Sequence, residues 1–394
     1  MEPFINVHCH LVNFGFVPDS FFKTRAGVRE RLLRGRFTRW LARVISFVLN
    51  LGRGQDKKYD KLHEALDLLG MEIEGVADAL VEEMAMRDYG KAEIVLATPL
   101  MMDLEPACLN VKPEVPYRYQ ILLVSRIAAR HPGRLMPFIM VDPRRPAAFD
   151  LTRTALEEMG FLGVKLYPPL GYHPDPASFA NEREVNRELA RLYEYCEALE
   201  VPITTHCSRG GAYGEELVRC RRAAHEFCQP SSWEGVLRKH RRLRLNFAHF
   251  GSREGEPGSG TFLSRYDEDS WCSAILRLMS EYENVYADLA YHDDALRGKS
   301  CNAYFCNLEE TLNDPLVERR VLFGTDWLMT RHTWTEGQYV RAFMKLRKEC
   351  RDRVVFENPL DFLFPGRKMP GRLTRFYGSN GLELPQWMRG KLTV

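Results

Sequence analysis

Eight short apolar segments recur along the chain, and most of them are followed by a stretch with helical spacing. Apolar runs of this length are typical of parallel strands that are buried on both faces. Eight such strands alternating with helices predict an α/β fold, a (β/α)₈ TIM barrel. An open doubly wound sheet is the alternative. The predicted strands are 4–10, 92–99, 135–143, 161–168, 201–207, 243–251, 285–290 and 321–327.

A long segment, residues 11–90, separates the first two predicted strands. Its first part is basic and is followed by an apolar run over 40–49, and residues 60–88 have helical spacing. A basic amphipathic helix can bind a membrane surface or an acidic partner. We favour a helical insertion that forms a lid or a homodimer contact at the barrel mouth. The basic residues are Lys23, Arg25, Arg29, Arg31, Arg34, Arg36, Arg39 and Arg43.

Length and composition fit one large domain. Barrels with insertions reach 394 residues, so we expect a single domain over 1–364 and a tail over 365–394 that wraps it. The net charge of +2 argues against nucleic acid as a partner. Ten scattered cysteines include no Cys-x-x-Cys pair, which argues against a structural zinc site. With no signal peptide and no apolar run that could cross a bilayer, the expected location is cytoplasmic.

Histidines and carboxylates stand at the ends of several predicted strands. His8 and His10 are two residues apart on the first strand, so their side chains point to the same side. Together with His206 and Asp326 they would give three nitrogens and one oxygen, with one position open for water. Water bound there would lose a proton near neutral pH. His249 and Asp326 are then the candidate catalytic acid and base.

Five motifs in chain order carry a family resemblance. The chain resembles the amidohydrolase superfamily, in the branch called amidohydrolase family 2, which includes aminocarboxymuconate semialdehyde decarboxylase. The resemblance implies a metal-bearing barrel with His8, His10, His206 and Asp326 as ligands. It also implies that His249 contacts the substrate or the metal-bound water. The motifs are His-Cys-His at 8–10, Gly-Val-Lys-Leu-Tyr-Pro at 163–168, Thr-His-Cys at 205–207, Ala-His-Phe-Gly at 248–251 and Gly-Thr-Asp-Trp at 324–327.

Lys165, on the fourth strand, decides how many metal ions are expected. In binuclear members of the superfamily a carboxylated lysine at this strand end bridges two ions. As an amine, Lys165 would instead be a cation for an anionic substrate or a structural residue. We favour one ion. The donor set suits Zn²⁺, Mn²⁺ or Fe²⁺ with small differences in affinity.

Loop residues beyond the strand ends are candidates for contacting a small-molecule substrate. Tyr167, Tyr172 and Trp327 are expected to line the mouth. The Arg209 guanidinium could clamp a carboxylate, or it could pair with Glu215 or Glu216 in its own loop. Three further loop histidines are interpreted as solvated: His173, His292 and His332.

Three functions are compatible with these residues. The leading hypothesis is a metal-dependent hydrolase that attacks an amide, ester or lactone carbonyl. The second is a metal-dependent non-oxidative decarboxylase acting on a carboxylated aromatic or muconate-like substrate, because the superfamily uses one ligand set for both reactions. The third is a non-catalytic or membrane-associated barrel that functions through its basic insertion.

Overall fold

The computed structural model describes residues 1–18, 57–87, 89–108, 111–209, 211–214, 221–252 and 270–393. The basic and apolar parts of the predicted insertion therefore lie outside the described residues, as do Glu215 and Glu216. The lid and the homodimer contact stay predictions.

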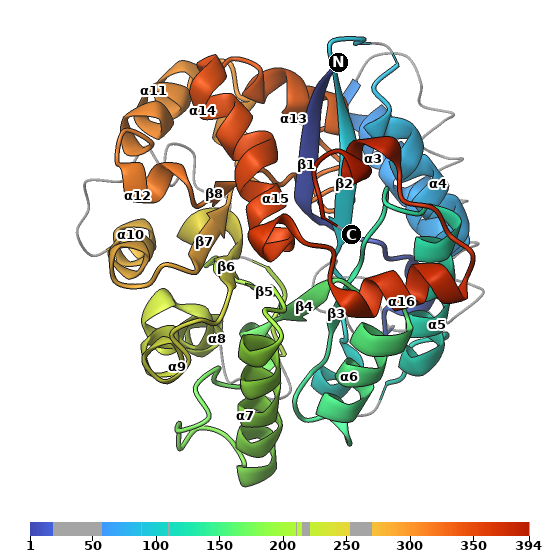
Figure 1. The fold of residues 1–394 in the computed structure, drawn as a ribbon, viewed down its shortest axis with the longest axis vertical. Coiled ribbons are helices and arrows are strands. Elements are labelled where there is room, and N and C mark those ends of the chain that lie inside the picture. Colours follow the sequence, from blue (N-terminus) through green and yellow to red (C-terminus); the bar gives the residue numbers. More distant parts are fainter. Residues whose placement is uncertain are drawn as a thin grey trace.

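Eight parallel strands form the centre of the molecule (Figure 1). β1 pairs with β2, and β3 to β8 pair in chain order, each with the next. Isolated bridges join the two sheets, from Ala97 to Leu135 on one side and from Cys9 to Trp327 on the other. The ring is thus closed, and the predicted TIM barrel is confirmed. The strands are β1 (Glu2–Cys9), β2 (Ala92–Pro99), β3 (Phe138–Met140), β4 (Gly163–Leu166), β5 (Ile203–Thr205), β6 (Leu245–Phe247), β7 (Val285–Asp288) and β8 (Val321–Leu322).

Helices surround the strands and bury their outer faces (Figure 1). No helix in the described part of the chain is both long and apolar enough to cross a bilayer. The helices are α3 (Lys57–Gly70), α4 (Ile73–Met84), α5 (Tyr117–Arg130), α6 (Ala148–Glu158), α7 (Arg183–Ala198), α8 (Arg221–Cys228), α9 (Glu234–Lys239), α10 (Trp271–Glu281), α11 (Cys301–Thr311), α12 (Pro315–Glu318), α13 (Glu336–Phe343), α14 (Lys348–Asp352), α15 (Asn358–Leu363), α16 (Gly371–Ser379) and α17 (Gln386–Arg389).

Two predicted elements differ from the structure. The helical spacing over 60–88 belongs to two helices, because the chain turns after Gly70 and Glu72 is extended (φ −63°, ψ 151°). The predicted strand 321–327 pairs with β7 only over Val321–Leu322. Beyond these two residues the backbone departs from strand geometry, and Asp326 has a φ of +60°.

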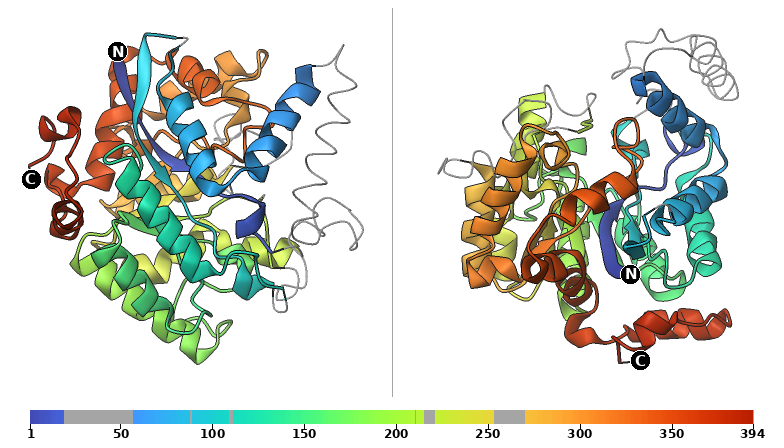
Figure 2. Two further views of the ribbon diagram at one scale, coloured as in Figure 1. Left: turned by 90° about the vertical axis from the view of Figure 1, so that its right-hand side faces the viewer. Right: turned by 90° about the horizontal axis from the view of Figure 1, so that it is seen from above.

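The C-terminal segment packs on the outside of the barrel. α16 lies against α6, on the side of the molecule where β1 begins (Figures 1 and 2). The guanidinium of Arg372 on α16 is buried and donates to the carbonyls of Phe161 and Leu162, in the turn before β4. These bonds satisfy backbone acceptors that would otherwise be buried without a donor.

We predict that Arg372→Leu lowers the free energy of unfolding by about 2–4 kcal/mol, because it leaves buried carbonyls without donors. Urea unfolding followed by circular dichroism measures the change. Arg375→Leu, on the exposed side of the same helix, is the matched control and should change the free energy by less than about 0.5 kcal/mol. Equal losses in the two variants would contradict the role given to Arg372.

Candidate metal centre

The ends of the first and last strands bring three donor atoms together. His8 lies at the end of β1, His10 comes directly after this strand, and Asp326 follows β8. Nε2 of His10 lies 3.1 Å from Oδ1 of Asp326, and Nε2 of His8 lies 3.5 Å from the same oxygen. All three side chains are buried. Three of the four predicted ligands thus form one cluster, in which the donor atoms lie within 4.8 Å of one another.

The other ring nitrogen of each histidine is held by an acceptor. Nδ1 of His10 donates to the carbonyl of Leu100 at 2.8 Å. Nδ1 of His8 donates to Oδ2 of Asp288 at 3.1 Å. Because the proton of a neutral imidazole then resides on Nδ1, both Nε2 atoms present lone pairs. Metal-binding histidines have this pattern, in which the second nitrogen donates to a carbonyl or carboxylate.

The donor set fits a divalent cation. Burial opposes ionisation of Asp326, but His8 and His10 outweigh it and hold the pKa of this carboxyl below its usual range. Within the described part of the chain, Oδ1 of Asp326 is buried without a hydrogen-bond partner. When both rings are neutral, two nitrogen lone pairs therefore face one negatively charged oxygen. Such a convergence is repulsive unless a cation lies between the atoms, and imidazole with carboxylate is a donor set for Zn²⁺, Mn²⁺ or Fe²⁺.

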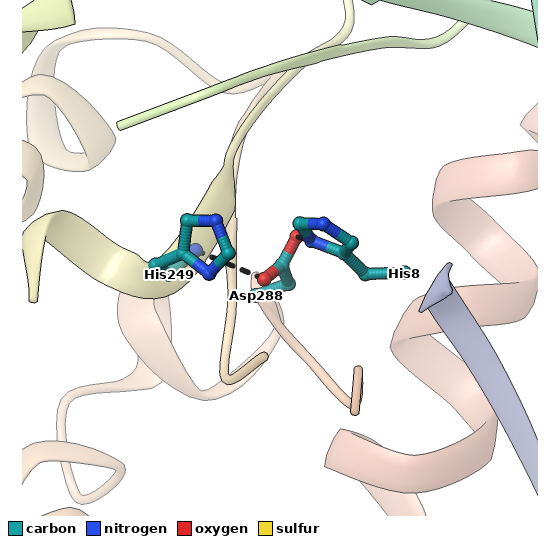
Figure 3. A group of neighbouring side chains, drawn as sticks. All are labelled: His8, His249 and Asp288. Carbon is teal, nitrogen blue, oxygen red and sulfur yellow. Dashed lines mark hydrogen bonds and ion pairs between the residues drawn. The ribbon is translucent and has the colours of Figure 1, made fainter. Parts of the chain in front are cut away.

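Asp288, at the end of β7, supports the centre. Figure 3 shows its carboxylate between His8 and His249. Besides His8, this carboxylate accepts from Nδ2 of Asn246 at 2.7 Å and from the backbone amides of His249 and Ala290 at 3.0 and 3.1 Å. Burial opposes its ionisation, but His8 lowers its pKa well below the usual range. With four donors on two oxygens, Asp288 orients His8 and His249 through hydrogen bonds. Its carboxylate also forms, with His8 and His249, a second group of donor atoms close enough together to hold a cation.

His249 is held in an uncommon conformation next to this cluster. Its φ is +62°, in the left-handed region, and its ring lies 4.8 Å from the ring of His8. Nδ1 donates to the carbonyl of Ala290 at 3.0 Å, which leaves the lone pair on Nε2. Burial, with the neighbouring His8, lowers the pKa of His249 to about 3. The imidazole is therefore neutral at physiological pH.

His292 corrects an expectation drawn from the sequence. It was interpreted as a solvated loop histidine, yet it is buried. Its Nε2 donates to the carbonyl of His249 at 2.9 Å, and its Nδ1 lies 2.8 Å from the hydroxyl of Tyr304. His292 thus holds the backbone of His249 from the far side. No spacing rule could identify this contact, because the two residues are 43 positions apart.

His206, after β5, lies beside His249 and apart from the three-donor cluster. The two rings are 5.0 Å apart, and the ring of Tyr167 stacks on His206 at 4.4 Å. The hydroxyl of Tyr167 accepts from the amide of Ala212, and the hydroxyl of Tyr172 accepts from the amide of Tyr167. These tyrosines are buried and fix the loop around His206. The role of His206 as a fourth ligand stays a prediction.

The other predicted residues occupy different positions. Lys165 is buried below the cluster, where its Nζ has no hydrogen-bond partner in the described chain, and burial lowers its pKa to about 8. Trp327 is buried next to Asp326. Arg209 lies farther out, with its guanidinium 5.1 Å from the ring centre of Trp271. It lines a separate hollow of about 410 Å³ together with Ser231 and Arg277.

Comparisons with known proteins place the fold and the family. The family model described as amidohydrolase matches residues 5–364. Two decarboxylases of known structure each cover 92% of this chain at 12% identity and a TM-score of 0.52. One is 2,6-dihydroxybenzoate decarboxylase in complex with 2,6-dihydroxybenzoate, of which 99% is covered. The other is 5-carboxyvanillate decarboxylase from Novosphingobium aromaticivorans with bound manganese, of which 97% is covered.

An uncharacterised TIM-barrel protein from Bordetella bronchiseptica is similar over 96% of this chain and 99% of its own. It is 14% identical, with a TM-score of 0.51. A search of curated proteins found no match. At such identities the structural likenesses show the fold alone.

We predict that His10→Ala removes bound metal while the barrel stays folded, because it deletes one of the converging nitrogens. Elemental analysis of the purified protein should fall from about one ion per chain to near zero, with an unchanged circular dichroism spectrum. His131→Ala is the control, since His131 caps α5 and lies 3.1 Å from Asp78, on a helix outside the barrel. Full metal content in His10→Ala would contradict the assignment.

Proposed function

The chain belongs to the amidohydrolase family, and on that premise we propose that it is a metal-dependent hydrolase that acts on the amide, ester or lactone carbonyl of a small organic substrate. The observation that carries the proposal is the convergence of His8, His10 and Asp326. His8 and His10 each donate through Nδ1, so both Nε2 atoms are available to a cation shared with Oδ1 of Asp326.

His8, His10 and Asp326 would hold the cation, with His206 as a fourth ligand. Bound there, a divalent ion such as Zn²⁺, Mn²⁺ or Fe²⁺ would supply a water of lowered pKa and polarise the substrate carbonyl. We propose one ion, with Lys165 as an amine. A carboxylated Lys165 that bridges two ions is the alternative.

The protein's own side chains would move the protons. Asp326 is ionised and can accept a proton from the attacking water. Nε2 of His249 carries a lone pair, so it can receive a proton and deliver it to the leaving group. Because Ala290 and His292 hold its ring and its backbone, His249 needs little reorganisation during the reaction.

A second candidate is non-oxidative decarboxylation of a carboxylated aromatic. It is supported by the two decarboxylases of known structure that share this fold over most of the chain. The substrate contacts predicted from the sequence stay proposals: Tyr167, Tyr172 and Trp327 are buried around the site, and Arg209, farther out, could bind a substrate carboxylate. The two reactions differ in product. Hydrolysis of an ester, lactone or amide releases a carboxylic acid, whereas decarboxylation releases carbon dioxide.

The test is a substrate screen with metal-loaded protein. Lactones, esters and amides are incubated beside carboxylated phenols, and acid release is followed in parallel with carbon dioxide release. We predict acid release from the first group. Carbon dioxide release alone would replace the first proposal with the second, and neither product from a metal-loaded protein would count against both.

On any substrate so found, His249→Asn should lower kcat by about 10²–10⁴-fold while bound metal is retained. Asparagine tolerates the left-handed backbone at this position but cannot transfer the proton. His240→Asn is the control, since His240 pairs with Glu197 before β6, at the opposite end of the barrel. An unchanged kcat in His249→Asn would exclude the proton-transfer role.

A further inference from the structure

A glutamate that the proposed chemistry does not use is buried beneath the metal centre. Glu336 is the first residue of α13, and its side chain is 1% exposed. Its Oε1 accepts from the hydroxyl of Thr325 at 2.7 Å and from Nδ2 of Asn6 at 3.1 Å. Its Oε2 is buried and has no hydrogen-bond partner in the described chain. A buried carboxyl in this position is costly unless it contributes to the structure around it.

The two partners of Glu336 hold the backbone on either side of the metal cluster. Oδ1 of Asn6 accepts from the amide of His8 at 3.0 Å and from the amide of Thr325 at 3.3 Å. The hydroxyl of Thr325 accepts from Nδ2 of Asn6 at 2.8 Å and from the amide of Trp327 at 3.1 Å. Asn6 therefore holds the backbone amide of His8, a proposed ligand. The hydroxyl of Thr325, the residue before Asp326, holds the amide of Trp327, the residue after it.

β1 meets the segment that follows β8 through backbone hydrogen bonds, from Val7 to Phe323 at 3.0 Å, from Asp326 to His8 at 2.8 Å and from His10 to Trp327 at 2.9 Å. β8 has only two residues in its ladder with β7, and past them the chain turns into the left-handed conformation at Asp326. The close approach of the two strands requires Gly324, since a Cβ there would lie 2.9 Å from Cβ of His8. The side-chain network of Asn6, Thr325 and Glu336 adds to these backbone hydrogen bonds and ties the two strand ends together.

We propose that Glu336 is a positioning residue that sets, through Asn6 and Thr325, the separation between the nitrogens of His8 and His10 and the carboxylate of Asp326. This inference rests on the proposed metal site. Glu336 itself touches neither the ion nor the substrate. It acts by fixing one strand end relative to the other.

The network of Asn6, Thr325 and Glu336 requires a hydrogen-bond acceptor at position 336 but no negative charge on that side chain. Both hydrogen bonds to Oε1 come from donors, Thr325 Oγ1 and Asn6 Nδ2. Burial raises the pKa of Glu336 to about 8, and nearby Glu83 adds to the rise, so the side chain is protonated at neutral pH. Glutamine keeps the carbonyl oxygen in the same place. Leucine has a similar volume but removes the acceptor of the Thr325 hydroxyl and of one N–H of Asn6.

The experiment measures metal affinity directly. Apo protein is titrated with Mn²⁺ and, separately, with Zn²⁺, and free metal is determined after equilibrium dialysis. Glu336→Gln should bind within about twofold of the wild type. Glu336→Leu should bind about 10–100-fold more weakly, the range expected when the support of a metal ligand is lost.

Glu188→Leu is the matched control for the loss of a buried carboxyl. Glu188 is 4% exposed on α7, where it accepts from the amide of Phe149 at 2.7 Å in the outer layer of the barrel. This variant should lose stability and keep its metal affinity. Weakened binding in Glu336→Leu together with normal binding in Glu188→Leu would support the positioning role, which general destabilisation cannot imitate.

If Glu336→Leu does not fold, Thr325→Val and Thr325→Ser replace it, since valine removes the hydroxyl and serine keeps it. Thr325→Val should weaken metal binding by about 10–100-fold, the same loss that is expected for Glu336→Leu. Thr325→Ser should bind metal like the wild type. Wild-type metal affinity in a folded Glu336→Leu variant or in Thr325→Val overturns this inference and leaves the proposed function standing. A wild-type protein that binds neither metal overturns the proposed function, and the inference falls with it. Equal loss in the glutamine and leucine variants overturns the acceptor role.

Discussion

Two nitrogen lone pairs and one carboxylate oxygen face each other across the seam between the first and last strands, and the rest of the site depends on this contact. The direction of the lone pairs is set elsewhere, by the carbonyl of Leu100 and the carboxylate of Asp288. Asp288 in turn depends on Asn246 and on the amide of His249. The candidate metal centre therefore draws on five strands, β1, β2, β6, β7 and β8, which is what a closed barrel makes possible.

Backbone strain is concentrated at the same end of the barrel. Asp326, His249, Tyr291 and Leu328 all have φ between +60° and +70°, a region that costs about 1–3 kcal/mol for residues other than glycine. Each of the first two is tied down by hydrogen bonds, His249 by Ala290 and His292, and Asp326 by its own amide donating to the carbonyl of His8 at 2.8 Å. The strain turns functional side chains inward, and the surrounding network maintains it.

Much of this arrangement follows from the sequence, and the exceptions have physical causes. All eight strands were predicted, because buried parallel strands are short apolar runs, and His8, His10 and Asp326 were identified from their places at strand ends. The carbonyls of Leu100 and Ala290 carry no signal, since every residue has a carbonyl. Glu336 was missed because its partner Asn6, 330 positions away, is brought near only by barrel closure. His292 was misjudged because the pairing of β6 with β7 brings it to the carbonyl of His249, which carries no signal in the sequence. The break between α3 and α4 was missed because the apolar spacing continues through it.

Anomalous diffraction from crystals of the metal-loaded protein tests the central claim most directly. The structure predicts a single strong peak between Nε2 of His8, Nε2 of His10 and Oδ1 of Asp326, with no extra density on Nζ of Lys165. A peak bound elsewhere on the chain, or no peak in protein that turns over substrate, would contradict it. In the latter case the convergence of these three side chains would need another explanation.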